Sequence, residues 1–467
     1  MIINSYHWQS RSLPEGTTGA QVWEALFADL PLAVLLESPA HALSRLSRYA
    51  IAAGSPRQMW LPPVGEILPC LRALQSSLTS SCDPTDKASA SEAEWQDLPF
   101  TGGYLGWLGY DLAWEIEKLP YLKSDVLPFP VAFWYEPECF VVIDSQENLA
   151  WLAASDRLQL QNLSDRLSRE LDLESRNKQQ NSDRECILDL TSHNHQDLTF
   201  TPDVDIYTNI VRQAQKHIYA GDIFQANLSL RFGAKCSSDG WEIYKRLQRI
   251  NPSPFASYWR TPWGEVISAS PERLVQLQGD RVQTRPIAGT RSRGKDARSD
   301  RLQAEELLAC PKERAEHIML VDLERNDLGR VCTWGSVQVD ELLEIERYSH
   351  VMHIVSNVIG QLRSDRDAID LIQAVFPGGT ITGCPKVRCM EIIEALEPHR
   401  RSLFYGSCGY IDRRGMDLNI LIRTLLKCGD LIWGQVGAGI VADSLPEREW
   451  QESLHKAQAQ LVALGII

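Results

Sequence analysis

Short apolar runs separated by glycine-rich turns recur along the 467-residue chain, and this pattern most constrains its fold. The runs AVLLES at 33–38 and VAFWYEPECFVVID at 131–144 have the length and the aromatic and β-branched content of strands. After about residue 200, strand-like runs alternate with helix-like segments. No run reaches the roughly 18 apolar residues that a membrane span needs. The sequence therefore predicts a mixed fold, α/β or α+β, and no membrane partner.

Two polar stretches indicate how the chain divides. Residues 76–94 (SSLTSSCDPTDKASASEAE) are small and polar, which predicts an exposed loop. Residues 156–176 repeat leucine at three- and four-residue steps, which predicts an amphipathic helix, and NKQQNSDRE after them is linker-like. We therefore predict an N-terminal region at 1–155, a helix and linker at 156–199, and a catalytic region at 200–467.

Composition and charge exclude several classes of function. Asp plus Glu number 61 against 47 Lys plus Arg, and the resulting net charge of −14 argues against a nucleic-acid partner, which would need a basic surface. The eleven cysteines are scattered without the spacing of a zinc or redox motif. The N-terminus lacks the apolar segment of a secretory signal. We expect reduced thiols and a cytoplasmic protein.

Two pairs of glutamates have helical spacing. Glu313 and Glu316 lie in KERAEHIMLVDLERNDLG at 312–329, and Glu449 and Glu452 follow near the C-terminus. On a helix, residues three apart share a face. Two such faces can hold Mg²⁺, which takes one or two carboxylates together with waters and substrate. The alternative is that both are ordinary solvated surfaces, as most glutamates are.

Three turns combine glycine with threonine or serine: residues 285–294 (RPIAGTRSRG), 376–386 (FPGGTITGCPK) and 436–444 (VGAGIVADS). Such turns either bring backbone N–H groups to an anion or are purely structural. None is a Walker A loop or a dinucleotide fingerprint, so ATP and NAD are not indicated. Arg423 lies in an apolar run, LNILIRTLL, where its charge needs an anion. That anion is either a salt-bridge partner or a substrate carboxylate.

Together these segments resemble the chorismate-utilising enzymes, which include anthranilate synthase component I, aminodeoxychorismate synthase component I, isochorismate synthases and salicylate synthases. The resemblance is specific from about Phe200 to the C-terminus. It is looser before that point, through LLES at 35–38 and PFTGGYLGWLGYD at 99–111. It implies two packed, largely antiparallel β-sheets surrounded by helices, chorismate as substrate and Mg²⁺ as cofactor.

The resemblance also implies catalytic residues. Glu272, in SASPERL, matches the carboxylate that protonates the leaving hydroxyl of chorismate. A glutamate can be such an acid only if burial or another carboxylate raises its pKa. His353, whose apolar neighbours alone would suggest a core histidine, matches the active-site histidine of the family.

The family pattern further implies a metal site and a substrate pocket. Glu316 and Glu452 match the Mg²⁺ ligands, with Glu313 and Glu449 in the adjacent shell. The implied substrate-binding residues are Gly289, Thr290, Glu313, Thr380, Tyr405, Arg423, Gly437, Gly439 and Lys456.

One position separates amination of chorismate from hydration. Water-using members of the family carry a lysine base where this chain has Gln225, in AGDIFQANLSLRF. Glutamine cannot accept a proton near neutral pH, so ammonia is the expected nucleophile. The chain contains no glutaminase motif. Use of glutamine therefore implies a separate glutamine amidotransferase subunit that delivers ammonia.

Signals for the particular product disagree. Many aminodeoxychorismate synthases carry a nucleophilic lysine in PIKGT, but this chain has Ala288, as anthranilate synthases do, so it has no nucleophile there. Asn227, in place of the valine usual in anthranilate synthases, and the segment ITGCPKVRCMEII favour aminodeoxychorismate synthase. MLVDLERNDLGRV and RYSHVMHIVSNV favour anthranilate synthase. We favour the former, with the latter as the alternative and a non-catalytic chorismate or tryptophan sensor as a third hypothesis.

LLES resembles the segment that binds tryptophan in this family, and its alternative interpretation is an ordinary buried strand. Phe255 and Ala256 stand where the feedback-inhibited pattern has tyrosine and methionine, so the sequence does not predict inhibition by tryptophan. The residues of this possible tryptophan site are Leu36, Glu37, Ser38, Pro254 and Phe255.

Overall fold

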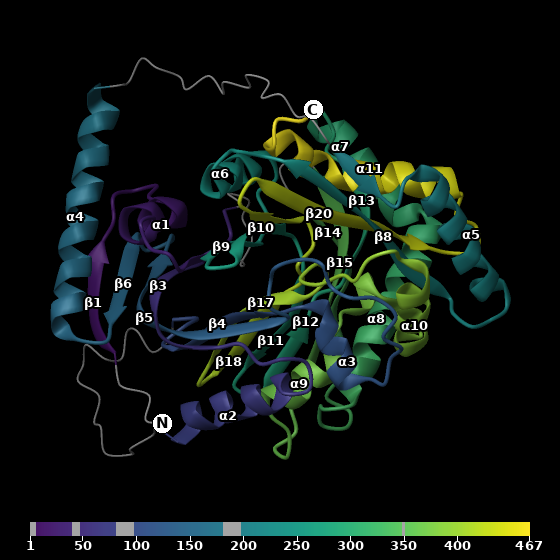
Figure 1. The fold of residues 1–467 in the computed structure, drawn as a ribbon, viewed down its shortest axis with the longest axis horizontal. Helices are drawn as coiled ribbons and strands as arrows, with labels where there is room; N and C mark the ends of the chain where they lie inside the picture. Colours follow the sequence, from purple (N-terminus) through teal and green to yellow (C-terminus); the bar gives the residue numbers. More distant parts are fainter. Residues whose placement is uncertain (1–5, 40–46, 81–97, 181–197, 348–350) are drawn as a thin grey trace.

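The computed structural model describes residues 6–39, 47–80, 98–180, 198–347 and 351–467 (Figure 1). Its strands pair with antiparallel neighbours throughout this part of the chain, and helices cover them. The expected mixed fold of helices and largely antiparallel strands is confirmed. Among the described residues, no helix is long and apolar enough to span a membrane.

The strands are β1 (His7–Ser12), β2 (Ala33–Glu37), β3 (Tyr49–Trp60), β4 (Gly103–Leu108), β5 (Ala132–Asp144), β6 (Leu149–Ala154), β7 (Thr199–Thr201), β8 (Gln225–Lys235), β9 (Phe255–Thr261), β10 (Gly264–Ser270), β11 (Arg273–Gln278), β12 (Arg281–Thr284), β13 (Ile287–Ser292), β14 (Gln338–Arg347), β15 (Val351–Gln361), β16 (Gly383–Cys384), β17 (Ser407–Asp412), β18 (Gly415–Asn419), β19 (Thr424–Cys428) and β20 (Leu431–Ile440). The helices are α1 (Gly19–Phe27), α2 (Ile67–Ser80), η2 (Tyr110–Leu112), α3 (Ala113–Ile116), α4 (Arg157–Gln180), α5 (Val204–Tyr219), α6 (Gly240–Ile250), α7 (Ala297–Ala309), α8 (Pro311–Gly329), α9 (Ala368–Val375), η3 (Gly379–Ile381), α10 (Lys386–Leu396) and α11 (Pro446–Ala463).

The two halves of the chain share one continuous run of paired strands. From β8 the hydrogen-bonded order is β20, β19, β10, β9, β2, β3, β5, β4, β17, β18, β11, β12 and β15. Strands β2 to β5 of the N-terminal half therefore lie between strands of the C-terminal half. The predicted region boundaries at 155 and 199 remain a prediction, and strand pairing crosses them.

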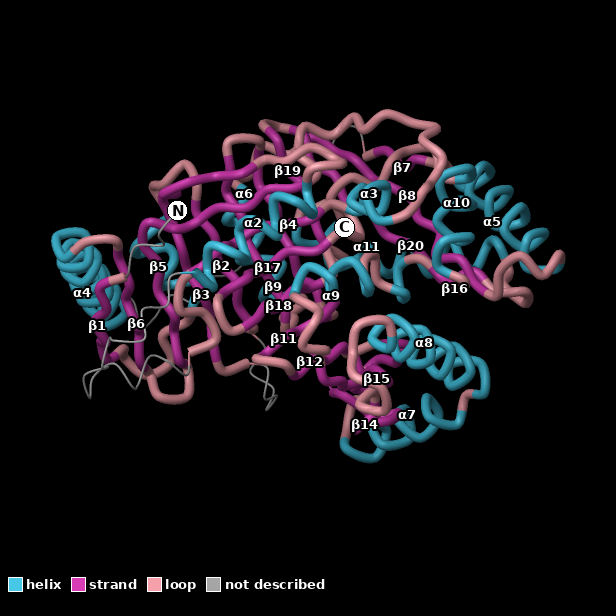
Figure 2. Tube along the Cα trace, turned by 90° about the horizontal axis from the view of Figure 1, so that it is seen from below, coloured by secondary structure: helices cyan, strands magenta, loops and turns pink. Residues whose placement is uncertain are grey.

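Large aromatic and aliphatic side chains fill two main hydrophobic cores. Trp107 and Trp134 belong to the core beneath β4, β5 and β17, which α2 and α9 cover. Trp23 and Trp241 belong to the core between β8, β20 and the helices α5, α6 and α11 (Figure 1). A third, smaller core that includes Leu307 joins α7 to β15, and Figure 2 shows α7, α8, β14 and β15 grouped at one side of the molecule.

The structure tests the predictions made for the two polar stretches of the sequence. Helix α4 (Arg157–Gln180) confirms the predicted helix. It also includes residues 177–180, so the linker prediction was wrong there, and residues 181–197 lie outside the described part of the chain. The predicted loop at 76–94 was wrong at its start, because α2 continues to Ser80. Leu71, Leu74 and Leu78 are all buried at helical spacing, and this apolar face carries the helix into the polar stretch. Residues 81–94 lie outside the described part of the chain.

Candidate active site

Strands β8 and β20 form a floor that is polar on one face. Alternate side chains of a strand point to opposite faces, so Gln225, Asn227, Ser229 and Arg231 share one face of β8 while Ala226, Leu228, Leu230 and Phe232 enter the core. Opposite them on β20, Gly439 pairs with Asn227, and Gly437 pairs with Ser229. The floor therefore presents side-chain amides and hydroxyls beside bare backbone.

The two glycines keep this floor open. A Cβ atom on Gly437 would come within 3.0 Å of both Asn227 Oδ1 and Tyr405 OH, and one on Gly439 within 3.1 Å of Glu316 Oε1. The side chains of Thr380 and Tyr405 border this space and interact with Glu272 and Ser229. Two buried polar atoms of the floor, Gln225 Oε1 and Asn227 Oδ1, have no hydrogen-bond partner among the described residues. Buried polar atoms are normally paired, so these atoms fit a site that a polar ligand completes.

A bulge in β13 shapes one wall of the site. Gly289 has a φ of +69° at the register shift between β13 and β15, a conformation that favours glycine. Its carbonyl lies 3.3 Å from His353 Nδ1, and Thr290 Oγ1 lies 3.0 Å from the same nitrogen. A carbonyl can only accept, so Nδ1 carries the proton in this arrangement. Burial, aided by the positive charge of Arg423, lowers the pKa of His353 to about 4 and keeps the imidazole neutral.

Glu272 lies between β10 and β11 and is only 4% exposed. Burial, reinforced by the nearby Glu324 carboxylate, raises its pKa to about 8. A carboxylic acid with that pKa is largely protonated at neutral pH. The side chain thus meets the physical requirement for the predicted general acid.

The raised pKa of Glu272 has a consequence for stability. The folded protein keeps this proton up to about pH 8, whereas the unfolded chain loses it near 4.5, so stability falls as pH rises through that window. Glu272→Gln removes the titration. We expect the urea midpoint of the variant to rise relative to that of the parent protein between pH 5 and pH 9. A difference between the two midpoints that does not change with pH would contradict this account.

The predicted carboxylate pairs lie on α8 and α11, as their spacing suggested. Glu316 Oε1 accepts a hydrogen bond of 2.9 Å from Gln225 Nε2. Lys456 Nζ lies 2.9 Å from Glu452 Oε1 and donates to Gly437 O at 3.0 Å. The charges of Lys456 and Lys312 also act on Glu316 and Glu452, so the two helices face the same region.

The two remaining glutamates, Glu313 and Glu449, lie close enough to Glu316 and Glu452 for their charges to interact. Glu313 pairs with Arg291 at 3.4 Å, and one of its oxygens would lie 3.1 Å from a Cβ atom on Gly289. Burial raises the pKa of Glu449, and the neighbouring Glu452 adds to this effect. No three His, Cys, Asp or Glu side chains of the described residues cluster as a metal site. Two carboxylates on facing helices nevertheless fit Mg²⁺, which completes its shell with water and substrate oxygens.

Arg423 has a φ of +50° and is half-buried. Among the described residues, its guanidinium has no ion pair and no hydrogen bond, and burial lowers its pKa. A charge in such surroundings needs an anion. Of the two sequence-based hypotheses for this residue, the geometry favours a clamp for a substrate carboxylate.

A separate cavity of about 540 Å³ brings together all five residues of the possible tryptophan site, Leu36, Glu37, Ser38, Pro254 and Phe255. None of Glu272, His353 or Glu316 lines it. Glu37 accepts a 2.7 Å hydrogen bond from Tyr244 OH, and burial raises the pKa of its carboxyl to about 7. Tryptophan binding in this cavity stays a prediction.

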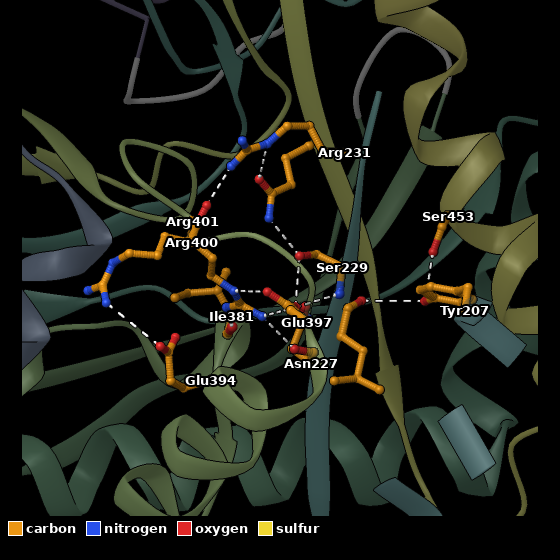
Figure 3. A network of polar contacts seen from close by, with 12 residues as sticks. Tyr207, Asn227, Ser229, Arg231, Ile381, Glu394, Glu397, Arg400, Arg401 and Ser453 are labelled. Carbon is orange, nitrogen blue, oxygen red and sulfur yellow. Dashed lines mark hydrogen bonds and ion pairs between the residues drawn. The ribbon is translucent and has the colours of Figure 1, made fainter. Parts of the chain in front are cut away.

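Sequence reasoning missed a buried polar network beside the polar face of β8, which Figure 3 shows from close by. Its centre is the ion pair between Arg401 and Glu397, at 2.7 Å, and the Arg401 side chain is 1% exposed. Two adjacent arginines in the otherwise compact segment PHRRSLFYG were the available signal. Only the fold shows that one of them points toward the site.

Antiparallel strands and helices thus bring together a neutral histidine, a protonated glutamate and an arginine that has no ion pair among the described residues. The chain belongs to the chorismate binding enzyme family, whose family model matches residues 34–462.

Individual relatives agree with this membership. The chain is 55% identical to a Synechocystis protein described as an anthranilate synthase component I-like protein, over 99% of this chain and 93% of that one. It is 44% identical to aminodeoxychorismate synthase component 1 of Bacillus subtilis, over 81% and 80% of the two chains. The crystal structure of anthranilate synthase component I from Streptococcus pneumoniae superposes with a TM-score of 0.72, at 30% identity over 89% and 93% of the chains.

Proposed function

We propose that this enzyme aminates chorismate to 4-amino-4-deoxychorismate, as aminodeoxychorismate synthase component I does. The observation that carries amination is the Gln225 amide in the floor, hydrogen-bonded to Glu316 where hydrating relatives would hold a lysine base. An amide cannot remove a proton from water, so the nucleophile must be competent by itself. Ammonia meets that condition.

The position of amination rests on Asn227. Its Nδ2 donates to Thr380 O at 3.1 Å, while Oδ1 is buried and has no partner among the described residues. An acceptor in this position can receive the C4 hydroxyl of chorismate or an N–H of ammonia. The valine usual in anthranilate synthases offers neither contact, which favours chemistry at C4.

Formation of anthranilate and pyruvate is the second candidate. Ala288 lies in β13 at the position where many aminodeoxychorismate synthases carry a nucleophilic lysine, and it cannot form a covalent bond to substrate. The relative at 55% identity is also described as anthranilate synthase-like. Both reactions use the same acid and the same pocket.

In the proposed reaction, Glu272 donates its proton to the C4 oxygen, which leaves as water, and ammonia supplies the new C–N bond. Arg423, Thr290 and Tyr405 hold the carboxylates and the enolpyruvyl group. Bound Mg²⁺, held by Glu316 and Glu452, would neutralise the ring carboxylate. We further propose that a separate glutamine amidotransferase subunit delivers the ammonia, and that free ammonia at alkaline pH replaces it.

The deciding measurement is product analysis. The protein is incubated with chorismate, Mg²⁺ and ammonium at alkaline pH, with and without a 4-amino-4-deoxychorismate lyase. We expect p-aminobenzoate only when the lyase is present. Anthranilate and pyruvate without the lyase would establish the second candidate instead. Absence of turnover under every condition would support the third hypothesis, a non-catalytic sensor.

A further inference from the structure

Beside the polar face of the floor, one guanidinium contacts three separate segments of the proposed active site. Arg401 Nη1 donates to the carbonyl of Ile381 at 2.7 Å, and Nη2 donates to the carbonyl of Asn227 at 2.7 Å. Its Cζ lies 4.6 Å from the centre of the Tyr405 ring. Ile381 directly follows Thr380, so the three segments are those that carry Thr380, Asn227 and Tyr405.

The guanidinium is itself held rigidly. Its Nε and Nη2 atoms donate to the two carboxylate oxygens of Glu397 at 3.0 and 2.7 Å, in the two-pronged geometry that arginine favours. Glu397 Oε1 also accepts from the backbone N–H and the hydroxyl of Ser229, both at 2.8 Å. Ser229 is two residues from Asn227 on the same face of β8 (Figure 3). The ion pair therefore ties η3, β8 and the segment after α10 together.

We propose that Arg401 is a positioning residue of the active site, whose guanidinium fixes Thr380, Asn227 and Tyr405 in the geometry that binds chorismate. This inference rests on the proposed function for the identity of the ligand. Arg401 touches no substrate in this proposal, and its side chain is 1% exposed. It acts through Thr380, Asn227 and Tyr405, and Asn227 Oδ1 is the atom of these three that has no hydrogen-bond partner among the described residues.

The neighbouring Arg400 provides a matched control. Its side chain is 2% exposed, and its Nε donates to Asp111 Oδ2 at 3.0 Å. Its Cζ lies 3.9 Å from the Trp114 ring, so it is anchored in the N-terminal half of the chain. Arg400 thus equals Arg401 in burial and in charge pairing, but among the described residues its side chain forms its hydrogen bonds and ion pairs with Asp111, Lys123 and Glu394, outside the segments of the site.

The test compares Arg401→Lys with Arg400→Lys. Lysine keeps the charge but cannot form a planar fork that reaches two carbonyls and both oxygens of one carboxylate. We expect Arg401→Lys to lower kcat/KM for chorismate by about 100-fold, mostly through a higher KM, since misplacement by about 1 Å has effects of this size. Arg400→Lys should stay within about threefold of the parent, although both variants lose thermal stability.

The Mg²⁺ dependence of the rate distinguishes a positioning role of Arg401 from a general destabilisation of the active site. Arg401 has no contact with Glu316 or Glu452, so the Mg²⁺ concentration for half-maximal rate should not change. Equal kinetic losses in the two lysine variants, or a normal KM for chorismate in Arg401→Lys, would overturn the proposal. If Arg401→Lys does not fold, Glu397→Gln replaces it, because it leaves the arginine in place without its charged partner. A normal KM in that folded variant would overturn the proposal equally.

Failure of the proposed function has a different signature. If the parent protein turns over chorismate to either product, only the comparison of variants decides the role of Arg401. If the parent shows no turnover, the proposed function fails, and calorimetric titration with chorismate decides instead. Weaker binding by Arg401→Lys than by Arg400→Lys then supports positioning, and equal or undetectable binding overturns it.

Discussion

Glu272→Gln is expected to reduce kcat with chorismate and ammonium by about 10³-fold, the usual range for loss of a positioned general acid. The glutamine keeps the size of the side chain but has no acidic proton to give to the leaving oxygen. KM for chorismate should change little, because no role in holding the substrate is assigned to Glu272. Initial rates of product formation across pH 7 to 9 provide the measurement.

A buried carboxylate elsewhere serves as the control for this change. Glu394 is also 4% exposed, but it pairs with Lys123 and Arg400 outside the proposed site. Glu394→Gln should keep kcat near the parent value even if it unfolds more easily. Comparable loss of kcat in both variants would mean that Glu272 matters through the fold and not as an acid.

Glu316→Gln is expected to abolish Mg²⁺-dependent turnover, with a loss of about 100-fold or more at saturating Mg²⁺. An amide is a far weaker ligand for a hard cation than a carboxylate is. The fold should persist, since burial already disfavours the charge of Glu316 and raises its pKa. Rates measured over a range of MgCl₂ concentrations, together with a thermal unfolding curve, test both parts.

Asp322 lies on the same helix, and its side chain is 64% exposed. Asp322→Asn removes the same charge from α8 without touching the site, so its Mg²⁺ dependence should equal that of the parent. Unchanged activity in Glu316→Gln would remove this residue from the proposed metal site.

Helices whose formation depends on neighbouring residues could be predicted from the spacing of side chains in the sequence. Glu313 and Glu316 have the spacing that puts two side chains on one face if the segment is helical, and α8 spans the whole segment. The leucines after residue 156 predicted α4 for the same reason, because one apolar face at a period of 3.6 residues is visible in the sequence. The start of the first polar loop was mispredicted because the buried Leu78 contributes to α2 from within a polar stretch.

Features that depend on distant contacts could not be predicted from the residues alone. Nothing near Glu272 in the sequence indicates a pKa of about 8, which needs burial and the carboxylate of Glu324 from another element. The role of Arg423 stayed open until the structure showed no anion beside it among the described residues. Arg401 was missed because its partners Asn227 and Ile381 are 174 and 20 residues away in sequence.

The interleaving of the two halves has a consequence for how the protein is made. Strand β2 pairs with β9, and β4 pairs with β17, so the emerging N-terminal half cannot complete its own pairing. During synthesis, β4 must wait for residues beyond 400 to leave the ribosome, with one edge open in the meantime. We therefore expect nascent chains to need protection from aggregation until β17 (Ser407–Asp412) has been synthesised and can pair with β4.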